Sequence, residues 1–359
     1  MIFRTILAIA IALAAMVSLS RADEDRAGVI SQTIDEVIVA GYSALQERAK
    51  DQERAISALC SAPSPALLET ARAAFNETVR SWSRVEMFRF GPARTDYRFE
   101  RMFYWPDRKG RGLQQVQAIL AEKDETATSL ETLQQKSVAV QGLTSLEFAL
   151  FGTGSEELLE AGGYRCRYAD AVAQAIHEVS GEFVSAWQSA GGHAALMRDP
   201  GGHNPLYKTE AEVLQALIQA AREQLEIVGD IKIKTAIGET PDDAHSKRAP
   251  FWRSGDTIAS LRANIAGVQA LFTGHLDLLL GDDPASIANG LAFELSQADA
   301  ALASLEQLNR SWEDLVSDPE THGKLVYALI PLHGAKETVS ERYPEALGLV
   351  LGFNSLDGD

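Results

Sequence analysis

The sequence has only two cysteines, Cys60 and Cys166, among 359 residues, and its seven histidines are scattered along the chain. No two histidines stand four residues apart, so no helical pair of metal ligands is present. Two thiols without clustered histidines are also a poor basis for a zinc site. The sequence therefore lacks the motifs of the common zinc peptidases.

Three further patterns are missing. The chain has neither the Gly-x-Ser-x-Gly turn of many serine hydrolases nor a phosphate-binding P-loop. It shows no sustained alternation of apolar and polar residues, which argues against a β-sheet. Beyond the extreme N-terminus, no stretch is apolar over the roughly 20 residues that a membrane-spanning helix needs. These absences leave a helical protein without a common hydrolase or nucleotide-binding motif.

Positive charge is scarce. The chain has 33 Lys and Arg against 50 Asp and Glu, which gives a formal charge of −17. Removal of the leader described below, which carries Arg4 and Arg21, makes the charge two units more negative. Such a surface repels nucleic acid and anionic membranes, so neither is expected as a partner. It is compatible with cationic partners, metal ions included, and also with a simple role in solubility.

Residues 1–22 have the pattern of a signal peptide. Arg4 gives a positive start, residues 6–19 are apolar or small, and small residues flank Arg21 where a signal peptidase reads. The apolar run is short for a membrane span, and no cysteine follows it to carry a lipid anchor. We therefore expect an exported protein whose mature chain begins at Asp23, with a retained membrane anchor as the alternative.

The two cysteines could be joined in an oxidising compartment. A disulfide between Cys60 and Cys166 would tie the first helical region to the segment that follows residues 129–151. The distance between two thiols cannot be read from sequence, so paired and free cysteines both stay open.

The rest of the chain has a helical pattern almost throughout. Apolar residues recur three and four positions apart, and the good helix formers Ala, Leu, Glu and Gln are abundant. Helices of this number and length favour bundles, so we expect an all-α protein of two packed helical bundles. The expected helices cover residues 30–58, 66–85, 113–121, 129–151, 168–190, 210–234, 256–280, 284–308 and 323–339.

A glycine-rich stretch divides the mature sequence nearly in half. It is the longest loop signal in the chain. We therefore expect an N-terminal bundle at 23–190, a linker loop at 191–209 and a C-terminal bundle at 210–359. The two halves share a short pattern, Gly142-Leu143-x-x-Leu146 and Gly267-Val268-x-x-Leu271. A distant internal duplication would explain it, and a match this short also arises by chance, so both explanations stay open.

The segment 142–152 combines an apolar helix face with one carboxylate, Glu147. Thr144 stands three residues before it and shares its side of the helix. A carboxylate among apolar residues is strongly unfavourable unless a cation, a metal or a ring of donors compensates it. Glu147 is therefore the candidate metal ligand, and a structural carboxylate paired with an arginine is the alternative.

Two arginines with aromatic neighbours are candidates to compensate this carboxylate. Arg89 lies between two phenylalanines, and Arg253 follows Trp252. An arginine in such a setting can stack on an aromatic ring and bind a carboxylate at once. We expect Glu147 to lie in a cleft between the bundles, with one of these arginines within ion-pair range and Trp105 or Trp252 as a wall.

The segment around Glu147 also resembles the signature of the imelysin family, which is Gly-x-His-x-x-Glu within a helix. Gly142 and Glu147 match, whereas Thr144 stands where the histidine would be. Four other segments resemble the family, especially its iron-regulated branch, and together they span nearly the whole mature chain in the expected order. They are Phe88-Arg89-Phe90-Gly91-Pro92, Tyr104-Trp105-Pro106-Asp107, Pro250-Phe251-Trp252-Arg253-Ser254-Gly255 and the terminal residues 352–359.

The resemblance implies a periplasmic protein linked to iron uptake, with a site between the bundles near Glu147. The family is also classed among metallopeptidases. Without the histidine, the helix offers one carboxylate and one hydroxyl, whereas a catalytic zinc takes three protein ligands. We therefore expect a binding role in the acquisition of iron or another divalent cation. A metal-dependent peptidase and a non-catalytic interaction module for a periplasmic partner are the alternatives.

Overall fold

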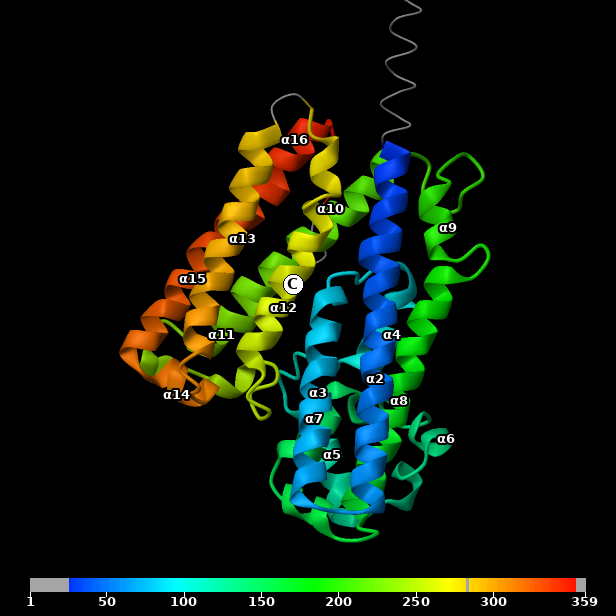
Figure 1. Cartoon of the computed structure of the whole chain (residues 1–359), viewed down its shortest axis with the longest axis vertical. Helices are drawn as coiled ribbons and strands as arrows, with labels where there is room; N and C mark the ends of the chain where they lie inside the picture. Colours follow the sequence, from blue (N-terminus) through cyan, green and yellow to red (C-terminus); the bar gives the residue numbers. More distant parts are fainter. Residues whose placement is uncertain (1–25, 282–283, 353–359) are drawn as a thin grey trace, which may run out of the picture.

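The computed structural model describes residues 26–281 and 284–352, and no strand occurs in these ranges. The expected leader at 1–22 and nearly all of the terminal family motif, at 353–359, lie outside the described residues. The prediction of an all-α protein with two packed helical bundles is confirmed (Figure 1). None of the described helices is long and apolar enough to cross a membrane.

The first bundle is built on the long helices α2, α3 and α8, and the shorter helices pack against them (Figure 1). From residue 26, the first that the structure describes, the chain is helical and passes through a π-helical turn, Ile34–Val39, into α2. The helices of this half are α2 (Ala40–Ser61), α3 (Pro65–Val85), α4 (Arg98–Met102), α5 (Arg111–Glu122), α6 (Leu130–Leu133), α7 (Leu143–Phe151), α8 (Tyr164–Gln188) and α9 (His193–Arg198).

The second bundle lies beside the first and is built on α10, α12, α13 and α15 (Figure 1). A π-helical segment, Ile227–Lys234, continues α10 and later contributes to the site. The helices of this half are α10 (Glu210–Glu226), α11 (Thr235–Ile237), α12 (Thr257–Phe272), α13 (Pro284–Glu306), α14 (Trp312–Ser317), α15 (Pro319–Glu337) and α16 (Tyr343–Leu347).

Helix α3 shows how local sequence and packing cooperate. Ser64 caps it by accepting a hydrogen bond from the Leu67 N–H (3.3 Å), and Pro65 occupies its first turn. The apolar positions that recur along one side are buried against α2 and the second bundle, among them Phe75 and Trp82. This helix therefore belongs to the core of the first bundle and to the contact between the two bundles.

The two bundles meet where α3 crosses α12. A β-carbon at Gly267 would lie 2.2 Å from the main-chain oxygen of Arg84, so only glycine fits at this crossing. Beside it, Arg80 of α3 forms an ion pair with Asp256 at the start of α12 (2.7 Å). Asp256 occupies the N-cap position of α12, but its carboxylate binds Arg80 and makes no cap hydrogen bond.

The expected helix at 129–151 is broken into three short helical pieces in the structure. They are α6, a 3-10 turn at Val138–Val140, and α7. The break before α7 follows from Gly142, whose backbone is extended and whose missing side chain allows close contact with the Arg101 and Met102 carbonyls. As a result, Glu147 lies on a separate nine-residue helix.

The segment expected as a linker loop, 191–209, contains the short helix α9. His193 is buried at its start, and its Nε2 lies 3.0 Å from the Tyr207 hydroxyl. Burial lowers the pKa of His193 to about 4, so the ring is neutral at physiological pH. The role of this segment as a domain boundary stays a prediction.

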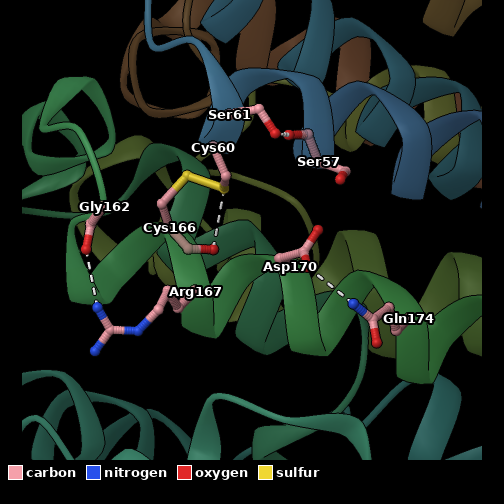
Figure 2. Close-up of a disulfide and its surroundings, with 8 residues drawn as sticks. All are labelled: Ser57, Cys60, Ser61, Gly162, Cys166, Arg167, Asp170 and Gln174. Carbon is pink, nitrogen blue, oxygen red and sulfur yellow. Dashed lines mark hydrogen bonds between the residues drawn. A yellow bond between two sulfur atoms is a disulfide. The ribbon is translucent and has the colours of Figure 1, made fainter.

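Cys60 and Cys166 form a disulfide that joins the end of α2 to the start of α8, across 106 residues of sequence (Figure 2). Their Cα atoms lie 5.5 Å apart, which is a usual distance for such a bond. This decides the question that the sequence left open. The bond closes a loop that contains α3 to α7 and therefore every part of the first bundle that contributes to the site below.

We expect the double substitution Cys60→Ala/Cys166→Ala to lower the free energy of unfolding by about 2–5 kcal/mol, because the unfolded chain regains the freedom of a long loop. Urea denaturation of the oxidised protein and the double variant measures this difference. A loss below about 1 kcal/mol would show that the disulfide does not constrain the unfolded chain in this way.

Candidate functional site

A cavity of about 540 Å³ lies between the two bundles. The first bundle lines it with α5, α7 and residues 104–108, and the second with the π-helical segment and residues 247–253. The cavity contains five of the six residues that the sequence singled out: Thr144, Glu147, Trp105, Trp252 and Arg253. Their role in binding stays a prediction, but the fold brings them together.

Helix α7, which carries Thr144 and Glu147, is held at both ends. At its start, a β-carbon on Gly142 would lie 2.4 Å from the Arg101 oxygen, so α7 begins in direct contact with the main chain that ends α4. At its end, the buried guanidinium of Arg165 binds three main-chain oxygens at 2.8–2.9 Å, those of Phe148, Ala149 and Thr153. A cation at a helix C-terminus is favourable, and here it also fixes the position of the helix.

Glu147 is buried, with 3% of its surface exposed, and its two oxygens have different surroundings. Oε1 accepts hydrogen bonds from the main-chain N–H groups of Arg253 and Ser254 (3.0 Å each) and from the Ser254 hydroxyl (3.1 Å). Within residues 26–281 and 284–352, no hydrogen bond reaches Oε2. One oxygen therefore connects the two bundles, and the other is available to the cavity.

Burial raises the pKa of the Glu147 carboxyl. The hydrogen bonds from Ser254 and the positive charge of Arg253 act in the opposite direction without offsetting the burial. The group therefore holds its proton to a higher pH than an exposed glutamate does. Its free oxygen can present either an acceptor or an O–H donor to a ligand.

Arg253 compensates Glu147 through its main chain rather than through an ion pair. Its guanidinium carbon lies 4.3 Å from the ring centre of Trp252 and 5.5 Å from that of Phe148. Arg89, the other candidate, does not line the cavity. It forms an ion pair with Glu86 instead (2.6 Å). The expected ion pair to Glu147 is thus replaced by a ring of hydrogen-bond donors.

Trp105 and Phe251 line one wall of the cavity, and both stack on the buried ring of Phe103. The Phe103 ring lies between Trp105, at 5.9 Å and 12°, and Phe251, at 5.1 Å and 17°. The column crosses the interface, since Phe251 comes from the second bundle. Offset stacking of this kind adds about 0.5–1.5 kcal/mol per pair beyond the burial of apolar surface. The stack therefore joins the two bundles along this wall.

Behind this wall lies a buried ion pair that sequence reasoning missed. Lys232 has no exposed surface, and its Nζ contacts Glu86 Oε2 (2.6 Å) and Asn264 Oδ1 (2.8 Å). Burial lowers the pKa of Lys232, and the charge of Glu86 opposes this. Burial would raise the pKa of Glu86, but Lys232 and Arg89 bring it below its usual value. The available signal was a lysine between two isoleucines in a helix.

The cavity offers few of the side-chain ligands that usually bind a bare metal ion. None of its lining residues is a histidine. Asp107 also faces it, but its carboxylate accepts hydrogen bonds from the N–H groups that begin α5, at 2.9–3.1 Å. No group of three or more His, Cys, Asp or Glu residues in the described part of the chain could hold a metal. The assignment of Glu147 as a metal ligand stays a prediction that this donor set does not favour.

Residues 38–337 of the chain match the family model for imelysin. The chain belongs to the imelysin family. A relative, the iron-regulated protein A of Synechococcus elongatus, is 25% identical over 264 residues, which cover 71% of this chain and 68% of the relative. The substitution of Thr144 for the motif histidine is therefore a feature of a true imelysin sequence.

Two solved structures share the imelysin fold. An imelysin-like protein from Psychrobacter arcticum 273-4 superposes with a TM-score of 0.78 at 18% identity, covering 92% of this chain and 98% of the other. A protein from Parabacteroides distasonis, proposed to be an iron-regulated protein A precursor, gives 0.75 at 15% identity, with 89% and 95% covered. At these identities the likeness establishes the fold alone.

Proposed function

We propose that this protein is a periplasmic binding protein of iron acquisition and that the cavity between its bundles holds the ligand. The observation that carries the proposal is the free oxygen of Glu147 in a cavity of about 540 Å³ with Trp105 and Trp252 in its walls. Cavities of roughly 300–1,000 Å³ with apolar walls and a few oriented polar groups are typical of small-ligand sites.

Two further observations support the setting. The relative of 25% identity is named for its regulation by iron, which favours a role in iron acquisition. The leader pattern and the disulfide both favour export, because disulfides persist in oxidising compartments such as the periplasm.

The proposal predicts that protein purified from the periplasm of iron-replete cells, without a His tag, carries a small ligand and iron. Native mass spectrometry and metal analysis would detect both. Trp252→Ala should lose the ligand because it removes a cavity wall, whereas Tyr327→Ala, a half-exposed aromatic on α15, should retain it. Ligand-free wild type, or equal retention in the Trp252 variant, would contradict the proposal.

We also predict no zinc-dependent peptide hydrolysis. A catalytic zinc usually takes three protein ligands and activates a water, whereas Thr144 offers only a neutral hydroxyl beside Glu147. Peptide-cleavage assays with added zinc, chelator and a Glu147→Ala control decide this point. Cleavage that disappears with both chelator and the control would favour the peptidase alternative.

A further inference from the structure

The cavity is basic although the protein is acidic. The whole chain has a formal charge of −17. Among the residues that line the cavity, however, four carry positive charge and two are acidic. The basic residues are Arg108, Lys247, Arg248 and Arg253, and the acidic ones are Asp107 and Glu147.

The positive charges are more available than the negative ones. None of the four basic side chains forms an ion pair within 4 Å with an acidic side chain of the described ranges. Arg108, Lys247 and Arg248 are exposed at the rim. In contrast, both oxygens of Asp107 are engaged by α5, and one oxygen of Glu147 is engaged by residues 253–254.

The walls add flat aromatic surface close to these charges. Arg253 and Lys247 both lie over the Trp252 ring, at 4.3 Å and 5.5 Å from its centre. Trp105 is half-buried, lines the cavity and stacks on Phe103, which in turn stacks on Phe251. Cations beside flat aromatic faces provide attraction for negative groups and stacking surface for conjugated rings in one place.

We propose that the cavity binds a small organic anion with a flat conjugated part, so that iron enters it as an anionic chelate rather than as a bare cation. This inference rests on the binding function proposed above and specifies its ligand class. A hard cation prefers several oxygen ligands, and Glu147 offers one free oxygen. A chelate brings its own ligands, and its negative charge and rings match the basic rim and the tryptophan walls.

Isothermal titration calorimetry with three probes tests the inference: iron(III) bound by dihydroxybenzoate, iron(III) bound by citrate, and an iron(II) salt alone without oxygen. We expect the dihydroxybenzoate complex to bind most tightly, and added salt to weaken its binding. Charge reversal at the rim, Lys247→Glu/Arg248→Glu, should raise its dissociation constant about tenfold or more.

The matched control is Lys50→Glu/Arg94→Glu, which makes the same change in net charge at exposed residues that do not line the cavity. It should leave the dissociation constant within about twofold of wild type. Equal loss in the control would show a general charge effect and overturn the inference. If the citrate complex bound as tightly as the dihydroxybenzoate complex, the inference that the ligand has a flat conjugated part would be wrong.

The remaining outcomes separate this inference from the proposed function. Tighter binding of iron(II) alone, strengthened by the charge reversal, would overturn the anionic class and leave a cation-binding role in place. Failure of all three probes with protein that carries a native ligand would overturn the ligand class alone. The same failure with ligand-free protein would overturn both proposals.

Discussion

Glu147→Ala is expected to lower the free energy of unfolding by about 3 kcal/mol, because it leaves the main-chain N–H groups of Arg253 and Ser254 without their acceptor. The Ser254 hydroxyl keeps the Phe251 oxygen as an acceptor (3.1 Å). Glu147→Gln keeps a carbonyl oxygen at the same position and should stay within about 1 kcal/mol of wild type. Urea denaturation of the three proteins measures both differences. Equal losses in both variants would show that the charge of Glu147 holds the bundles together.

The difference in stability between wild type and Glu147→Gln should also depend on pH. Because the pKa of Glu147 is raised in the folded state, its contribution to stability is full below the unfolded pKa of about 4.3 and is lost as pH rises through the folded pKa. Wild type should therefore lose stability relative to Glu147→Gln as pH rises above about 4. A difference that stays constant with pH would contradict the raised pKa.

Lys232→Met should produce the second large effect, a loss of about 3–5 kcal/mol, because it leaves Glu86 buried without its closest cation. Addition of Glu86→Gln should recover part of this loss, since the stranded charge is then gone. Lys324→Met, which removes an exposed pair with Glu320, is the matched control and should have an effect below about 1 kcal/mol.

Thermal or urea denaturation of these variants checks the prediction. A loss below about 1 kcal/mol for Lys232→Met would mean that Arg89 and Asn264 compensate Glu86 without the lysine. No recovery in the double variant would mean that the lysine stabilises the interface by packing against Phe103 and Trp105 rather than by its charge.

The helical fold and the meeting of Glu147 with Trp105 and Trp252 followed from sequence, through apolar periodicity and the resemblance to a family. The way in which the buried carboxylate of Glu147 is compensated could not be predicted from sequence. The donors to Glu147 are main-chain N–H groups more than 100 residues away, and they point at it because Phe251 adopts a positive φ of 58° in the preceding turn. The side chains of this segment do not predict a positive φ at Phe251.

The sequence also did not predict which charged residues would form ion pairs with one another. Asp256 has the sequence context of a cap, yet Arg80 lies within reach on another helix and binds it. Arg89 has the aromatic context expected at the cavity, yet Glu86 stands three residues before it on the same side of the chain. Local sequence gives the candidates for each pairing, whereas the crossing of α3 and α12 decides among the distant ones.

That crossing gives position 267 an influence beyond its own contacts. A single methyl group there would force the two bundles apart, because the Arg84 oxygen already occupies the space that it needs. The cavity walls belong to the same two bundles, with Trp105 on one side and Trp252 on the other. The width of the cavity therefore depends in part on Gly267, which does not itself line the cavity.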